Sequence, residues 1–153
     1  HLDQSLFARD ILNEKNGPPP EINLFNEKNN GESILKLIDK NFIKSAHDVS
    51  LGGVITALSK MCIMGKKGAT LKKPYYLINK FEYLFGEDQG RYIIEINKTN
   101  LKDVIKILTE NSVHFDELGT VNGDNLIIDD KSKVSIDDLI KSHTTWLTNY
   151  MSK

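Results

Sequence analysis

Apolar positions recur along this chain at two spacings, one typical of helices and one typical of strands. A return every three or four positions predicts an amphipathic helix, and a short β-branched or aromatic run bounded by turn residues predicts a strand. The predicted helices cover residues 3–17, 23–41, 53–65, 78–86, 99–111 and 135–151. The predicted strands cover residues 42–49, 68–71, 90–97, 113–121 and 125–129. Asp3 or Ser5 provides a cap for the first helix, and Ser135 with Asp138 resembles a capping box for the last.

The alternation of strands and helices predicts an α/β fold in which helices pack on a sheet. The last two predicted strands flank the turn sequence "NGD" as a hairpin would, so we expect a mixed sheet rather than a purely parallel one. A chain of 153 residues buries one good core, which favours a single α/β domain over residues 23–153. Residues 1–22 then form an N-terminal helix and a connector stiffened by "PPP".

The same patterns predict which side chains fill the core. The expected inner face of the helix at 23–41 consists of Leu24, Ile34, Leu35 and Ile38. In "SKMCIMG", we expect Met61 and Met64 to fill gaps in the core and Cys62 to behave as a small buried hydrophobe. Trp146 and Tyr150 lie four residues apart on the last helix, so they are expected to pack together.

Composition and charge narrow the classes of function. The formal net charge of −1 gives no general attraction to nucleic acid or to a membrane surface. The local basic run "GKKGATLKK" is typical of a solvated loop, with a nucleic-acid patch as the alternative. Because Cys62 is the only cysteine, neither an intrachain disulfide nor a thiolate zinc cluster can form. No apolar segment approaches membrane-spanning length and no signal peptide is visible, so the cytoplasm is the expected location.

A first polar cluster, "SAHDVSLGG" at residues 45–53, lies where a predicted strand becomes a helix. Glycines there would let backbone N–H groups approach a phosphate at the positive helix N-terminus, and Asp48 would then hold a divalent cation. The alternative is structural: Asp48 or Ser50 caps the helix, and the glycines permit tight packing. Both interpretations stay open at this point. The ligand-binding candidates are His47, Asp48, Ser50, Gly52 and Gly53.

A second polar cluster, "FGEDQGR" at residues 85–91, directly precedes the most clearly predicted strand. Loops at the rim of an α/β sheet are where ligands bind, and Glu, Gln and Arg side chains are all capable of ligand contact. A turn rich in Gly and Asp also forms without any function, so a plain turn is the alternative. The candidates in this cluster are Glu87, Asp88, Gln89 and Arg91. The spacing of residues along the chain displays no complete catalytic set.

Three stretches resemble, in their order and spacing, the C-terminal domain family of aminoimidazole ribonucleotide synthetase-like proteins. They are "SAHDVSLGGVITALSKMCIMG", "LFGEDQGRYIIEI" and "LGTVNGDNLII". The opening "LDQSLFARDILNEKNGPPPEINL" and the terminal helix also resemble a member of that family, so the resemblance spans nearly the whole chain. It implies a three-layer α/β/α arrangement with a mixed sheet.

The resemblance also implies a role. This chain would be the last domain of a longer enzyme that amidates formylglycinamide ribonucleotide in purine biosynthesis, using ATP, Mg²⁺ and ammonia from a partner glutaminase. The catalytic residues would lie in the N-terminal domains of that enzyme, so this chain alone is expected to be inactive and to require no cofactor. A start at His1 without a methionine fits an excised piece, although a processed or trimmed start would look the same. Asp48 and Glu87–Gln89 resemble second-half counterparts of the magnesium and substrate loops of the family.

Two positions depart from the pattern of the family. Leu51 stands where a second acidic residue is usual, and Asp88 stands in the middle of a Glu-Ser-Gln pattern. Both departures favour a scaffold role for this domain. The alternatives are a related synthetase, of the selenophosphate, hydrogenase-maturation or aminoimidazole ribonucleotide type, and a stand-alone binding module without catalysis.

The resemblance further leads us to expect Asp48 and Glu87 at the same rim of one sheet, where they share a cleft. His47 is expected to orient the loop through a backbone or carboxylate hydrogen bond rather than to act as a base.

Overall fold

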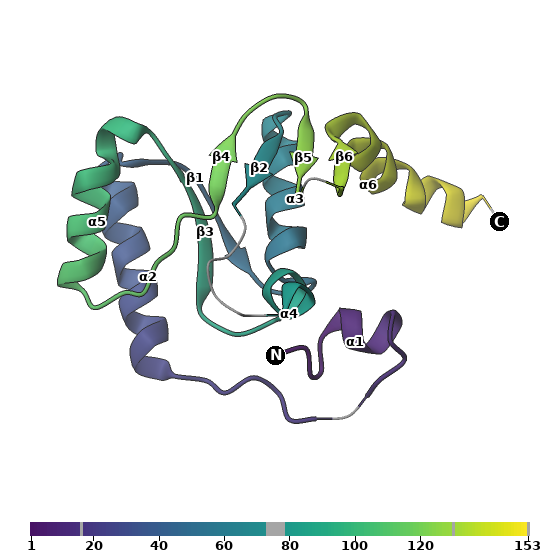
Figure 1. Cartoon of the computed structure of the whole chain (residues 1–153), viewed down its shortest axis with the longest axis horizontal. Coiled ribbons are helices and arrows are strands. Elements are labelled where there is room, and N and C mark those ends of the chain that lie inside the picture. The colour runs from purple at the N-terminus through teal and green to yellow at the C-terminus, as the bar shows by residue number, and fades with distance from the viewer. Residues whose placement is uncertain (16, 73–78, 130, 153) are drawn as a thin grey trace. The chain divides into compact units, whose positions relative to one another are not determined.

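The computed structural model describes residues 1–15, 17–72, 79–129 and 131–152, and it has a mixed α/β fold as predicted (Figure 1). The chain divides into two compact units. The first unit comprises His1–Leu58 and Ile78–Asp116, and the second comprises Ser59–Leu77 and Glu117–Lys153. The described strands form two sheets rather than the single mixed sheet that the sequence predicts, and each unit holds one of them.

The first unit is built on two antiparallel strands, β1 (Ile43–Val49) and β3 (Arg91–Ile96). Its helices are α1 (Leu6–Asp10), α2 (Leu24–Asp39), α4 (Lys80–Phe85), the 3₁₀ turn η1 (Lys98–Asn100), α5 (Leu101–Glu110) and the start of α3 (Gly53–Gly65). Helices α2 and α5 lie side by side (Figure 1), and Leu37, Val104 and Leu108 form the buried centre between them. Ile94 and Ile96 of β3 pack against this centre, so the two helices cover one face of the sheet.

The inner face predicted for α2 is wrong. Leu24 is 76% exposed, and Leu35 and Ile38 are exposed too, whereas Ser33 and Leu37 are fully buried. The apolar residues of α2 are spread over more than half of its circumference. Their spacing alone is therefore compatible with more than one inner face. The face that turns inward is partly polar because Asn30 donates a hydrogen bond to the carbonyl of Gly90, 2.9 Å away. The rotation of the helix thus goes with tertiary contacts, those of Leu37 with Val104 and Leu108 and that of Asn30 with Gly90.

The second unit holds the mixed sheet. Its strands are β2 (Ala69–Leu71), β4 (Gly119–Val121), β5 (Asn125–Ile127) and β6 (Lys133–Ser135), in the order β4-β2-β5-β6. The predicted hairpin is wrong, because β2 lies between β4 and β5 and pairs antiparallel with the first and parallel with the second. Gly68 permits this insertion: a Cβ atom at this residue would overlap the backbone of Asn125.

The last helix, α6 (Ile136–Met151), also belongs to the second unit. Its predicted cap is confirmed, since the Ser135 hydroxyl accepts a hydrogen bond from the amide of Asp138 at 3.1 Å. Cys62 is buried as expected, but Met64 is largely exposed, so the prediction that Met64 fills the core is wrong. No helix in the described part of the chain is both long and apolar enough to cross a membrane.

Candidate functional site

The first polar cluster is the turn between β1 and α3. Val49 ends the strand in a buried position, and Gly52 and Gly53 follow with φ angles of +83° and +70°. Glycine adopts this left-handed conformation without the steric cost that a Cβ atom brings. A Cβ atom on Gly53 would lie 2.7 Å from the carbonyl oxygen of Leu84 and 2.8 Å from that of Gly86. The glycines therefore let the start of α3 contact the backbone that leads into the second cluster.

Glu87 joins the two clusters directly. One oxygen of its half-buried carboxylate, Oε1, accepts a hydrogen bond from the amide of Gly52 at 2.8 Å and another from the amide of Leu6 at 2.9 Å. Gly52 immediately precedes α3, and Leu6 is the first residue of α1. A carboxylate is favourable at a helix N-terminus because the free amide groups and the helix dipole are positive there. The side of the helix start where a phosphate would bind is thus occupied by a carboxylate of the protein.

Aromatic stacking supports the same junction. The ring of Phe7 in α1 lies 4.4 Å from that of Phe85 and 5.4 Å from that of Phe81, with the ring planes 23° apart in both pairs. Stacked pairs of this kind add stability beyond the apolar area that they bury. Helices α1 and α4 are therefore held together beside Glu87. We call the contacts of Glu87, Gly52, Gly53 and Leu6 the Glu87 junction.

Asp48 and His47 occupy opposite faces of β1. The strand alternates between exposed and covered positions, which leaves the Asp48 side chain 65% exposed and His47 mostly covered. With a proton on Nδ1, the His47 ring donates to the carbonyl oxygen of Asp48 at 2.6 Å. This backbone contact is of the kind expected, and the role of His47 in orienting the loop stays a prediction. Val49 pairs with Arg91, so Asp48 and the second cluster also lie at the same end of the sheet, as expected.

Arg91 closes the turn that forms the second cluster. Its Nη2 donates to the carbonyl of Gly86 at 2.6 Å, and its Nε donates to the carbonyl of Asp88 at 3.1 Å. The carboxylate of Asp88 lies 3.4 Å from the same guanidinium. Burial lowers the pKa of Arg91 from its ordinary value, while the charge of Asp88 raises it. Arginine remains a cation at neutral pH, so the negative charge of Asp88 is balanced within the turn.

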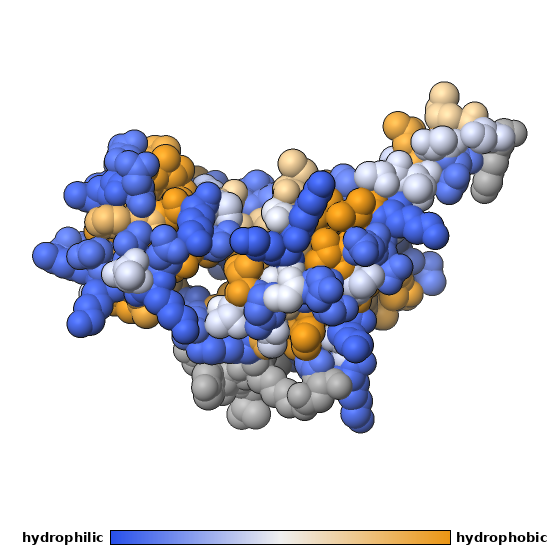
Figure 2. Space-filling model, turned by 90° about the horizontal axis from the view of Figure 1, so that it is seen from above, coloured by the Kyte–Doolittle hydropathy of each residue, from blue (hydrophilic) through white to orange (hydrophobic). Residues whose placement is uncertain are grey.

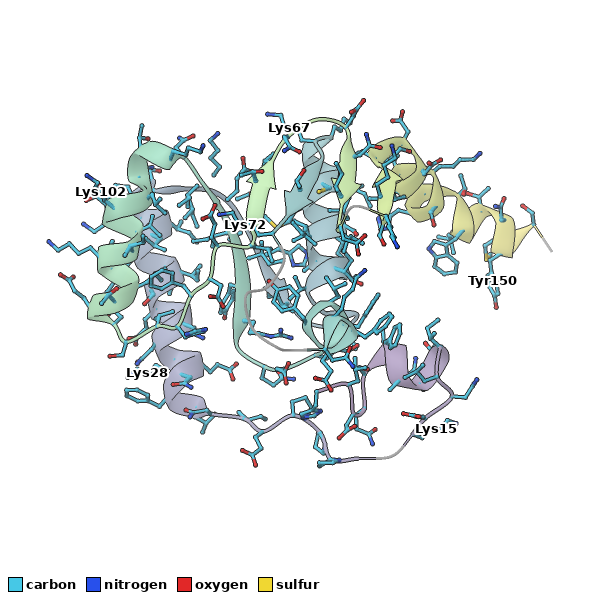
Figure 3. All side chains as sticks on the ribbon, viewed as in Figure 1. Lys15, Lys28, Lys67, Lys72, Lys102 and Tyr150 are labelled. Carbon is cyan, nitrogen blue, oxygen red and sulfur yellow. The ribbon has the colours of Figure 1, made fainter. Side chains whose placement is uncertain are left out.

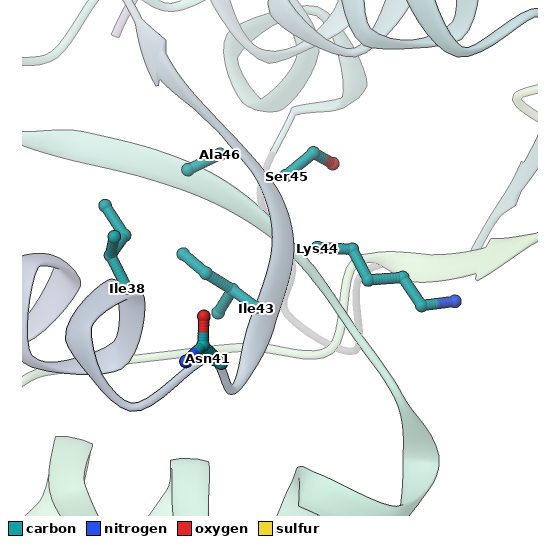
Figure 4. A pocket seen from close by; sticks show the side chains of 6 residues that line it. All are labelled: Ile38, Asn41, Ile43, Lys44, Ser45 and Ala46. Atoms are coloured by element: carbon teal, nitrogen blue, oxygen red, sulfur yellow. The ribbon is translucent and has the colours of Figure 1, made fainter.

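Two of the hollows among the described residues lie in the first unit. One, of about 270 Å³, lies between the second cluster and α2. It is lined by Glu21, Asn23, Asn26, Glu27, Asn30, Asp88, Gln89, Gly90, Arg91 and His114. The other, of about 330 Å³, is lined by Ile38, Asn41, Ile43, Lys44, Ser45 and Ala46 (Figure 4). Asp48 and Glu87 line neither of these two hollows, and the Glu87–Gly52 hydrogen bond connects the clusters.

The surroundings of Asp48 offer a single exposed carboxylate to a metal. In the ranges that the structure describes, no three His, Cys, Asp or Glu side chains are grouped as a metal would require. The carboxylate of Asp48 lies 3.4 Å from the imidazole of His47, Leu51 supplies no oxygen, and Glu87 is engaged by two amides. Mg²⁺ requires octahedral coordination by oxygen atoms, which waters and ligand phosphates usually complete around one or two protein carboxylates. Asp48 supplies one such carboxylate, and its role as a metal ligand stays a prediction.

The basic run at residues 65–73 is not a solvated loop throughout, because its residues 69–71 form strand β2, in which Ala69 and Leu71 are buried. Lys66 is exposed. Lys67 and Lys72 are exposed too (Figure 3), and Lys72 forms an ion pair with Glu117 at 2.5 Å. Lys73 lies outside the described residues, as does Ile78 at the start of the helix predicted for 78–86. Exposed lysines paired with acidic residues are typical of ordinary surfaces.

Sequence reasoning missed the contribution of α2. Asn23, Asn26 and Asn30 line the polar hollow together with Gln89, yet the pattern of α2 suggested only a helix with an apolar inner face. The signal available in the sequence was the spacing of the three asparagines, three and four residues apart, which puts their side chains on one helix face.

Comparisons with known proteins place the chain in a family. The profile of "AIR synthase related protein, C-terminal domain" matches residues 4–131. Phosphoribosylformylglycinamidine synthase subunit PurL of Pelagibacter ubique is 86% identical over 151 residues, which are 99% of this chain and 21% of that protein. The subunit of the same name from Bartonella bacilliformis is 40% identical over 151 residues, which are 20% of its length. The chain thus spans about a fifth of the length of these curated relatives.

Solved structures agree on the fold. PurL of Thermotoga maritima complexed with FGAR superimposes with a TM-score of 0.71 at 20% identity, over 88% of this chain and 24% of that one. The structure of PurLQS from the same organism superimposes with a TM-score of 0.67 at 20% identity, over 87% of this chain and 24% of the other. The fold, the two polar clusters and the matched residues lead to one conclusion. The chain belongs to the family of AIR synthase related proteins, as a C-terminal domain.

Proposed function

We propose that this chain is the C-terminal portion of a phosphoribosylformylglycinamidine synthase subunit, an ATP-dependent ligase of purine biosynthesis. The observation that supports this proposal most strongly is the 86% identity, over 99% of the chain, to the Pelagibacter ubique subunit of that name. The complete enzyme would convert formylglycinamide ribonucleotide to formylglycinamidine ribonucleotide in the cytoplasm. Its partners would be its own N-terminal domains and a glutaminase subunit that supplies ammonia.

The Thermotoga maritima structures fit this assignment. They are structures of PurL complexed with ATP, with AMPPCP and with FGAR, and of a PurLQS assembly. These structures support ATP as the phosphoryl donor of the proposed complete enzyme, and Mg²⁺ is a further part of the proposal. We assign no step of that chemistry to the residues of this chain, because Asp48 is a single exposed carboxylate and Glu87 is engaged by backbone amides.

Within that enzyme, this portion would contribute a scaffold and one ligand-facing surface. The Glu87 junction holds the starts of α1 and α3, so Glu87, Gly52 and Gly53 serve structure. Asp88, Gln89 and Arg91 line the polar hollow beside α2, and Asp48 and Ser50 are exposed at the same end of β1. These five are the candidates for ligand contact. A three-layer α/β/α arrangement and a domain beginning at residue 23 are part of the same proposal.

The chain on its own is expected to have no amidation activity. Phosphoryl transfer needs a positioned metal, a phosphate cradle and a nucleophile, and the described residues assemble none of the three. The measurement is ADP formation that depends on formylglycinamide ribonucleotide, with an ammonium salt as the nitrogen source so that ammonia delivery by the glutaminase is not required. Turnover by the purified chain would contradict the proposal.

The complete subunit provides the matching test. With the upstream polypeptide attached, the same assay should give turnover, and removal of residues 1–153 should abolish it. A complete subunit that hydrolyses ATP with selenide or with formylglycinamidine ribonucleotide instead would assign the chain to a related synthetase. If the complete reading frame adds no further domain, the stand-alone binding module is correct.

A further inference from the structure

The last helix exposes an unusual apolar surface. Ile136 at its start is buried, but every residue from 141 to 151 is exposed. Trp146 is 60% exposed and Tyr150 is 67% exposed, and Leu147 and Met151 are exposed as well. Aromatic side chains of this size bury large areas when they meet a partner, and Trp and Tyr are enriched at the centres of protein interfaces.

These side chains share one face of α6. Leu139, Ile140, Trp146, Leu147, Tyr150 and Met151 follow the three- and four-residue spacing of a single stripe, which we call the α6 stripe. The rings of Trp146 and Tyr150 pack against each other, with centroids 6.2 Å apart. Tyr150 projects outward from the end of the helix in Figure 3, and orange and pale atoms predominate there in Figure 2. The stripe thus carries an ordered aromatic pair toward its C-terminal end, and His143 lies between that pair and the first turn.

The charged residues of α6, namely Asp137, Asp138 and Lys141, lie in its first half. Residues 142–152 include no Asp, Glu, Lys or Arg. The hydroxyls of Thr144, Thr145 and Ser152 donate to the carbonyls four residues earlier, at 2.9, 2.8 and 2.7 Å. Helices that stay in water normally carry charged residues on the solvent face, and helices that lie on a membrane surface are rich in Lys and Arg. This end of α6 has neither feature, which favours a protein partner.

The comparisons indicate where that partner belongs. The family profile stops at residue 131, before α6, whereas the curated subunits align over 99% or more of this chain and extend to about five times its length. The helix is therefore present in the large curated subunits, but it lies outside the part of the chain that the family profile describes. We propose that the α6 stripe docks onto the polypeptide of the same subunit that lies outside residues 1–153. This inference rests on the proposal that the chain is part of a longer subunit, but not on the reaction that the subunit catalyses.

A photo-crosslinking experiment on the complete subunit, with its partner subunits present, tests the docking. p-Benzoylphenylalanine is placed at Trp146 in the stripe and, as a matched control, at Thr145 on the opposite face of the same turn. We expect crosslinks from position 146 to residues of the same polypeptide outside this chain, about tenfold more than from position 145, because only groups in van der Waals contact react efficiently. Peptide mapping by mass spectrometry identifies the acceptor.

Each other outcome overturns the proposal. Crosslinks to a separate subunit, to a second copy, to residues 1–116 of this chain or to lipid would name a different occupant, and equal low yields from both positions would mean that the stripe stays in water.

A second pair of variants covers the case in which the probe disturbs folding. Trp146→Glu with Leu147→Glu should lower the unfolding midpoint of the complete subunit, whereas Thr145→Glu with Thr148→Glu, which adds the same charge on the other face, should not. Equal effects of the two pairs would also overturn the docking. Activity is not the readout, so failure here leaves the proposed function standing.

Discussion

Replacing Gly53 by valine is expected to lower the free energy of unfolding by about 3–5 kcal/mol. Two costs add up. Valine is β-branched and strongly disfavours the φ of +70° at this position, and its Cβ atom would lie 2.7 Å from the carbonyl oxygen of Leu84. That oxygen belongs to the backbone, so it cannot swing aside as the end of a long side chain would. The start of α3 or the segment before Glu87 must therefore shift.

Chemical denaturation monitored by circular dichroism measures the loss. The matched control is Gly65→Val at the other end of the same helix, where the space for a Cβ atom is open within 4 Å. This control should change stability by less than about 1 kcal/mol, and in the favourable direction, since only helix propensity changes and that of valine exceeds that of glycine. Equal midpoints for Gly53→Val and the control would mean that the contact between α3 and residues 84–86 is loose, contrary to the Glu87 junction.

Replacing Glu87 by alanine is expected to cost about 2–3 kcal/mol, because hydrogen bonds to a charged acceptor are stronger than average and two amides lose the same partner. Glu87→Gln keeps an oxygen acceptor and removes the charge, so it should lose less. Gln89→Ala, two residues away and exposed, is the control and should change stability by about 0.5 kcal/mol or less.

Anion rescue makes the test of Glu87 specific. In Glu87→Ala the amides of Gly52 and Leu6 are left without their carboxylate, and acetate at high concentration should restore part of the stability by binding there. The wild-type protein should gain less from acetate, because its own carboxylate already occupies the position. An alanine variant as stable as the wild type, or equal gains for both proteins, would show that Glu87 does not hold the junction.

Local signals in the sequence predicted local features well. Ser5 caps α1 and Ser135 caps α6, as their positions before apolar runs suggested. The strand end at Val49 and the helix start at Gly53 lie where "DVSLGG" placed them. Each of these features depends on residues within about four positions of one another, a range over which hydrogen-bonding rules act directly.

The features that failed are the ones that distant residues decide. The Glu87 hydrogen bonds reach residues 35 and 81 positions away, so the spacing within "FGEDQGR" could not distinguish a ligand contact from a structural one. Strand β2 separates β4 from β5 although it comes about 50 residues earlier in the chain. In α2, the contact of Asn30 with Gly90 turns a polar face inward, which hydropathy alone cannot anticipate.

The central claim is that the two polar clusters of this chain serve the structure of a larger synthase and supply no catalytic group. Asp48 is the residue whose substitution tests that claim most severely, because it is the metal candidate and its carboxylate is exposed. The decisive measurement is kcat for amidation of formylglycinamide ribonucleotide by the complete enzyme carrying Asp48→Asn, together with the unfolding midpoint. The account predicts a kcat within about twofold of the wild type. A loss of about a hundredfold in kcat at an unchanged midpoint would place Asp48 in the chemistry and contradict it.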